Sequence, residues 1–197
     1  MVMKKVSVKK ERFYSAHHDL FRIAKYNLRQ AETQEQGYFD LQFITIIMCS
    51  LTIEAFCNAV GEKVIDNWKD FESCSPIAKT RLICEHLDVN YDDSRQPWGG
   101  LIWLSKTRNL IAHPKAEEII DENEMTLQEH QNYDREMHRN APKSKLENIV
   151  TLDNAKKSVA TVKQLIELFC EKLTDEQRFG ISSDMWSSST TFQHSHE

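Results

Sequence analysis

Hydrophobic and polar positions alternate along the first half of the chain with the period of an α-helix, about 3.6 residues. From Phe13 to near Gly37 this period predicts one amphipathic helix, whose apolar face is formed by Ala16, Leu20, Ile23, Ala24, Leu28 and Ala31. The next segment, Tyr38 to Val60, is apolar on nearly all sides. Such a helix must be covered on several faces, so we expect it at the centre of a bundle or in a subunit interface. Gly61 follows, where a left-handed C-terminal cap is expected.

Three further helices are predicted by period and by capping residues. After a short apolar segment around Trp68, Ser75 and Pro76 have the residue types of an N-cap and a first helical position, and they open a helix that reaches Leu87. Pro97 opens the next helix, WGGLIWLSKTRNLIA, which is anchored by Trp98, Leu101, Ile102, Leu104, Leu110 and Ile111. The last helix begins near Asp153, a candidate N-cap, and carries the apolar series Ala155, Val159, Val162, Leu165, Ile166, Phe169 and Leu173.

The periodicity is lost in two places. Residues 115–150 are polar and mixed in sign, with only Ile119, Ile120, Met125 and Leu127 as larger apolar side chains, and residues 176–197 form a serine-rich tail that we expect to be mobile. The sequence therefore predicts an all-α fold: a bundle of about five helices within residues 1–175, with a polar insertion at about 115–150 between the fourth and the last core helix.

Composition supports a soluble helical protein. The chain of 197 residues has only 5 glycines and 4 prolines, which is too few turn residues for a fold of many short strands. Its formal net charge of −5 argues against a protein covered in positive charge, so any nucleic-acid site must be a confined patch.

Cysteine usage and the N-terminus favour the cytoplasm. The 5 cysteines are odd in number and form no C-x-x-C pair, as expected of free thiols in a reducing compartment. MVMKKVSVKK has the basic start of a signal peptide without the apolar core that must follow it. The apolar stretch Leu41 to Val60 is long enough to span a membrane, but its polar residues, Glu54 among them, favour a buried central helix and no membrane.

The candidate chemistry lies in TRNLIAHPK, residues 107–115. Arg108 and His113 would be separated by about 140° on a continuous helix. Pro114 disfavours the helical conformation for His113, so the imidazole is expected at the helix end, where it can turn towards Arg108 and be oriented by Asn109. A guanidinium suits a phosphate, and an imidazole that titrates near neutrality suits proton transfer during metal-free RNA cleavage by the 2′-hydroxyl. The same two side chains are also ordinary capping residues of a helix C-terminus.

Other chemistries lack their starting residues. The chain contains no phosphate-binding loop of the G-x-x-x-x-G-K-[ST] type, no G-x-S-x-G and no H-E-x-x-H. His17 lies on the apolar face of the first helix, so a core or interface histidine is a better interpretation than a metal ligand. We therefore expect no cofactor and no metal.

An apolar second helix with an internal acid in SLTIEAFCNAV, together with RNLIAHP at the end of a later helix, resembles the HEPN superfamily. In that family R-x(4–6)-H marks the members that cleave RNA. The resemblance, from about Phe13 to Leu173 without the insertion, implies that Arg108 and His113 are the catalytic pair and that Asn109 supports them. It also implies a homodimer in which two motifs face each other.

Other residues and partners follow from the same resemblance. Glu54 would be a supporting acid, and Lys106 and Lys115 would join Arg108 in binding RNA phosphates. Independently of the resemblance, an acid on an apolar helix is expected to pair with a buried base such as Arg108. The protein would be a metal-independent endoribonuclease, a toxin or defence component, with an antitoxin or a nucleotidyltransferase-like protein as a partner. Two alternatives stay open: a non-catalytic HEPN-like module that binds RNA, a nucleotide or a protein, and a structural helical protein that acts through its apolar second helix.

Overall fold

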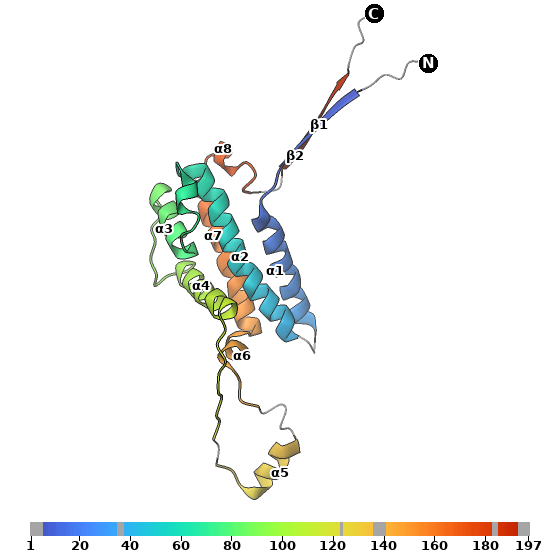
Figure 1. Ribbon diagram of the computed structural model, residues 1–197, viewed down its shortest axis with the longest axis vertical. Coiled ribbons are helices and arrows are strands. Elements are labelled where there is room, and N and C mark those ends of the chain that lie inside the picture. The colour runs from blue at the N-terminus through green and yellow to red at the C-terminus, as the bar shows by residue number, and fades with distance from the viewer. Residues whose placement is uncertain (1–5, 35–37, 123, 136–140, 183–184, 193–197) are drawn as a thin grey trace, which may run out of the picture.

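The computed structural model describes residues 6–34, 38–122, 124–135, 141–182 and 185–192. These residues are mostly helical, which confirms the predicted class in its main feature (Figure 1). In chain order the elements are β1 (Val6–Phe13), α1 (Ala16–Thr33), α2 (Tyr38–Val64), the 3₁₀ helix η1 (Trp68–Phe71), α3 (Pro76–His86), α4 (Trp98–Ala112), α5 (Leu127–Arg135), α6 (Lys145–Ile149), α7 (Leu152–Lys172), α8 (Asp175–Arg178) and β2 (Met185–Phe192).

Helix α2 is the centre of the bundle, as its all-round apolar pattern predicts. It packs against α1, α3, α4 and α7, and Phe56 on α2 stacks against Phe169 on α7 inside the core. By length and composition α2 could cross a membrane, but half of its most apolar stretch is buried by the other helices. This arrangement is compatible with a soluble protein whose central helix is covered by its neighbours.

Capping residues set where the helices begin. The Ser75 hydroxyl accepts a hydrogen bond from the Ala78 amide, and Pro76 is the first residue of α3, as predicted. The N-cap of α7 is Thr151, whose hydroxyl accepts from the Asn154 amide, so the prediction of Asp153 as the cap was wrong. Asp153 instead lies in the first turn, where a carboxylate is stabilised by the positive end of the helix.

Gly61 does not end its helix, contrary to the sequence prediction. Helix α2 continues to Val64, and Gly61 is a buried residue within it. A Cβ atom at this position would lie 2.5 Å from carbon atoms of the Trp68 ring. The glycine is therefore required by the close approach of the buried Trp68, and it allows η1 to fold back against the end of α2.

The two ends of the chain form a β-ribbon that the sequence did not predict. Strands β1 and β2 pair in antiparallel register from Val6 opposite Phe192 to Phe13 opposite Met185, and the ribbon extends from one end of the bundle (Figure 1). The expectation of a mobile serine-rich tail is thus wrong for residues 185–192, and Phe13 belongs to a strand rather than to the first helix. Next to the ribbon, the buried His17 is a core histidine, as expected: its ring lies 3.0 Å from the Ile181 carbonyl oxygen and meets Phe56 edge to face.

The insertion extends from the opposite end of the bundle (Figure 1). It carries the short helices α5 and α6, and its larger apolar side chains before α6 are exposed: Ile119, Ile120, Met125 and Leu127. These residues therefore contribute little to the core of this chain.

The packing of Gly61 generates a prediction for stability. Replacing Gly61 by alanine should lower the free energy of unfolding by about 1–2 kcal/mol, because overpacking against Trp68 outweighs the higher helix propensity of alanine. The matched control is Gly99→Ala, since a Cβ there would lie 3.6 Å from the Asp93 carbonyl oxygen, an ordinary contact distance. Urea unfolding of both variants provides the measurement, and equal midpoints would show that Trp68 does not restrict this position.

Candidate functional site

A cavity of about 320 Å³ lies between α2, the N-terminal end of α3 and the second half of α4. Its apolar surface comes from Ile53 on α2 and from Leu101 and Leu104 on α4. Its polar surface is contributed by serine hydroxyls, two carboxylates, an amide and a guanidinium, on Ser50, Glu54, Glu72, Ser73, Ser75, Ser105, Arg108 and Asn109. Two residues of the motif that was identified in the sequence, Arg108 and Asn109, thus line this cavity.

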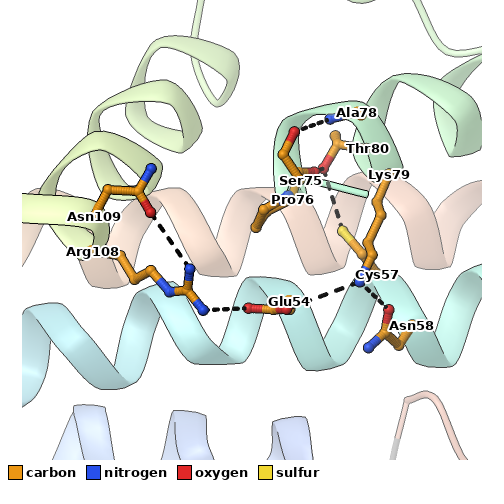
Figure 2. Close-up of polar contacts among 10 residues, drawn as sticks. All are labelled: Glu54, Cys57, Asn58, Ser75, Pro76, Ala78, Lys79, Thr80, Arg108 and Asn109. Carbon is orange, nitrogen blue, oxygen red and sulfur yellow. Dashed lines mark hydrogen bonds and ion pairs between the residues drawn. The ribbon is translucent and has the colours of Figure 1, made fainter. Parts of the chain in front are cut away.

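Glu54 joins the three helices around this cavity. One of its carboxylate oxygens lies 3.6 Å from a guanidinium nitrogen of Arg108 on α4, and the other lies 4.0 Å from the ammonium of Lys79 on α3. Figure 2 shows the carboxylate between these two cations. The expectation that Glu54 pairs with Arg108 is confirmed.

Lys79, which contacts Glu54 beside the cavity, was not singled out from the sequence. Its side chain is 1% exposed, and its ammonium donates a hydrogen bond of 2.8 Å to the side-chain oxygen of Asn58 on α2. A buried ammonium needs such partners, because burial of an unpaired charge costs several kcal/mol. The signal was present in the sequence, since Lys79 stands four residues before Ile83 and therefore shares the apolar face of α3.

Arg108 is only loosely held. Its side chain is 38% exposed, and besides Glu54 it reaches the side-chain oxygen of its neighbour Asn109 at 3.5 Å. Both distances exceed the 2.7–2.9 Å typical of charge-assisted hydrogen bonds. The guanidinium therefore keeps capacity to bind an anion.

His113 lies just beyond the end of α4, as Pro114 predicts. It is the C-cap of the helix, with φ −130° and ψ 57°, and its side chain is exposed and is not part of the cavity lining. Its backbone amide donates to the Asn109 carbonyl at 3.0 Å, whereas the Asn109 side chain contacts Arg108. The structure thus places Arg108 with Asn109 and leaves the imidazole facing solvent outside the cavity.

The remaining predicted residues lie outside the cavity as well. Lys106 and Lys115 are exposed, on α4 and after its end, and do not line it. Within the ranges that the structure describes, no group of three or more His, Cys, Asp or Glu side chains could hold a metal ion.

Three buried thiols of the core are poor nucleophiles. Burial raises the pKa of Cys57 to about 11, and it raises the pKa of Cys84 to about 12. Burial also raises the pKa of Cys49 far above its ordinary range. These thiols stay protonated at neutral pH, which argues against cysteine-based catalysis in the core.

The arrangement can bind an anion at Arg108, which lines the cavity, and can move a proton at His113, which is exposed at the end of the same helix. Comparison of the chain with protein families, with curated proteins and with solved structures found no match. The function is therefore inferred from the geometry of the cavity and of the helix end.

The shared carboxylate generates a prediction. Glu54→Gln should lower the free energy of unfolding by about 1–3 kcal/mol, because it leaves the buried Lys79 without a counter-charge. Lys79→Met should cost less than Glu54→Gln, since it removes the buried charge and keeps a side chain of similar length. The double variant should therefore be more stable than Glu54→Gln alone.

Denaturant unfolding of the two single variants and the double variant measures this coupling. Glu85→Gln, an exposed acid on α3, is the matched control and should change stability by less than about 0.5 kcal/mol. Additive effects of the two single substitutions would show that Glu54 and Lys79 are not coupled.

Proposed function

We propose that this chain is a metal-independent endoribonuclease of the HEPN type, a cytoplasmic toxin or defence component that acts as a two-fold homodimer. The observation that carries the proposal is the availability of the Arg108 guanidinium, which is half-exposed, held by long contacts and directed to a cavity. Guanidinium groups bind phosphate oxygens in pairs, so Arg108 suits the phosphate of an RNA backbone.

His113 would transfer the proton. The 2′-hydroxyl of the RNA attacks the adjacent phosphorus, the bond from phosphorus to O5′ breaks, and a 2′,3′-cyclic phosphate forms. One proton leaves O2′ and one is delivered to O5′, and an exposed imidazole can accept the first or donate the second. Arg108 would stabilise the negative charge that develops on the phosphoryl oxygens. Lys106 and Lys115 would add exposed positive charge beside the motif for the RNA backbone.

The surface of α2 supports a dimer. Phe39, Phe43, Ile47 and Leu51 are spaced at i, i+4 and so follow one line along this helix. Phe39 is exposed and the other three are half-buried, and in the described part of the chain none of the four packs against the core cluster. The line leads towards Ser50 and Glu54, which border the cavity. A second copy that covers this line would bring two cavities, and two copies of the motif, close to one axis.

This surface generates a prediction about assembly. The wild type should sediment as a dimer at micromolar concentration, and Ile47→Glu should sediment as a monomer, because a charge in the interface is desolvated without a partner. Ile120→Glu is the matched control, since Ile120 is an apolar side chain that is 72% exposed in the insertion, and it should remain dimeric. A monomeric wild type in sedimentation velocity experiments would contradict the two-fold arrangement.

A non-catalytic binding module is the second candidate, and one observation favours it. The Asn109 side chain contacts Arg108 rather than His113, and His113 does not line the cavity. In that case the cavity would bind its ligand without cleavage, and His113 would end the helix.

Cleavage of a mixed RNA pool separates the two candidates. Arg108→Ala and His113→Ala should each lower the cleavage rate by about 10²-fold or more, while Asn109→Ala should have a smaller effect. Activity should persist in EDTA, because the proposed chemistry uses no metal ion. Arg95→Ala and His86→Ala replace an exposed arginine and an exposed histidine elsewhere and serve as matched controls.

Melting temperatures measured in parallel show whether a loss of activity is a loss of fold. If Arg108 and His113 only cap the helix, Arg108→Ala and His113→Ala should each lower the free energy of unfolding by roughly 1 kcal/mol. Activity should then stay proportional to the amount of folded protein. A folded wild type that cuts no RNA, or a His113→Ala variant that cuts as fast as wild type, would favour the binding module.

A further inference from the structure

A further charged residue lines the cavity, Glu72, whose carboxylate has no partner among the residues that the structure describes. Glu72 follows η1 and lines the cavity. Its backbone amide bonds to the Lys69 carbonyl, but its carboxylate makes no hydrogen bond or ion pair within the described ranges. Glu72 is anchored next to the apolar Trp68 and Phe71, which hold η1 against the bundle. The exposed Glu72 therefore places an acceptor of two hydrogen bonds at the lining of the cavity, next to a segment that is held by packed aromatic side chains.

Two cations share the carboxylate of Glu54. This single carboxylate serves both Lys79 and Arg108, and the longer of its two contacts, 4.0 Å, is to the fully buried Lys79. A carboxylate shared by two cations neutralises each of them incompletely. The Arg108 side of the cavity can therefore bind an anionic group of a ligand. The Glu72 side can accept hydrogen bonds from the ligand's donors.

The space between these groups suits one flat, partly apolar molecule. The volume of about 320 Å³ is at the small end of ligand sites, which span roughly 300–1,000 Å³. Ile53, Leu101 and Leu104 supply an apolar surface, and the serine hydroxyls can donate or accept. A nucleotide combines these requirements, since it has an apolar ring face, a polar ring edge and a phosphate.

We propose that this cavity is a guanine-nucleotide site, in which Glu72 accepts hydrogen bonds from the N1–H and N2–H groups of the base and Arg108 binds the phosphate. The inference deepens the proposed function, because in a ribonuclease the nucleotide would be the one beside the phosphate that is cut. Its chemistry is the same for a free guanine nucleotide and for a guanosine within RNA.

The carboxylate selects among the bases. Guanine presents two adjacent donors on its Watson–Crick edge, which match the two oxygens of one carboxylate. Adenine and cytosine each present one amino donor beside a ring nitrogen that is an acceptor, and uracil presents one donor between two carbonyl oxygens. In these three bases an acceptor would face the Glu72 carboxylate and be left unpaired, which disfavours binding.

Binding of GMP, AMP, CMP and UMP to the full chain, measured by isothermal titration calorimetry, tests the site without requiring RNA cleavage. GMP should bind at least about 10-fold more tightly than the other three, and Glu72→Gln should remove this preference. Asp70→Asn is the matched control, because Asp70 is an exposed acid on η1 that does not line the cavity. Ser105→Phe should abolish binding of all four nucleotides by filling the cavity, and circular dichroism confirms that each variant is folded.

A second measurement distinguishes the source of the guanine. The ends of RNA fragments cut by the wild type should be enriched beside guanosine, and Glu72→Gln should lose that enrichment. GMP binding without any RNA cleavage would retain the guanine site and reject the ribonuclease. GMP binding with cleavage that ignores guanosine would assign the site to a free nucleotide. Equal binding of the four nucleotides, no GMP binding, or GMP binding that Glu72→Gln leaves unchanged would overturn the guanine site, whether or not RNA is cut.

Discussion

The carboxylate of Glu54 lies on the most apolar helix of the chain, and the arrangement of three helices depends on how its charge is balanced. Two cations from different helices, Lys79 on α3 and Arg108 on α4, converge on it. Because Lys79 is fully buried, Glu54 is needed to offset an ammonium that has been taken out of water, and this need fixes α3 against α2. Arg108 then has only a share of the carboxylate, which leaves it available at the edge of a cavity. Glu54 therefore contributes both to the stability of the bundle and to the availability of Arg108 at the cavity.

The helices could be predicted from the sequence because their signals are local. An apolar period of 3.6 residues identifies α1 and α7, and Ser75 with Pro76 marks the start of α3. Apart from the cap of α7, the errors occur where a distant segment decides the structure. Gly61 has the residue type of a helix end, but Trp68 packs on it and the helix continues. The strands β1 and β2 are far apart in sequence, and the sequence of either strand alone does not indicate that it pairs with the other.

The same distinction applies to the site. The position of His113 at the helix end follows from Pro114, a neighbour in sequence, and the pairing of Arg108 with Glu54 follows from the need to balance an acid on an apolar helix. Lys79 was missed although its spacing from Ile83 places it on the buried face of α3. The position of Glu72 could not be predicted, since the cavity that it lines is formed by α2, α3 and α4 together.

Arg108 and His113 are constrained in different ways, and this has a consequence for how they could act together. Arg108 lies within α4, whose buried residues fix the helix against the core, whereas His113 is the first residue of the chain that leaves the bundle for the exposed insertion. In an isolated subunit the guanidinium contacts Glu54 and Asn109 at the cavity, whereas the imidazole is exposed outside it. In the proposed ribonuclease, a bound RNA strand or a second subunit would supply the contacts that hold His113 near a phosphate at Arg108. The apolar line on α2 that ends beside the cavity is the surface on which a second subunit would do so, and on that basis assembly and catalysis would be coupled.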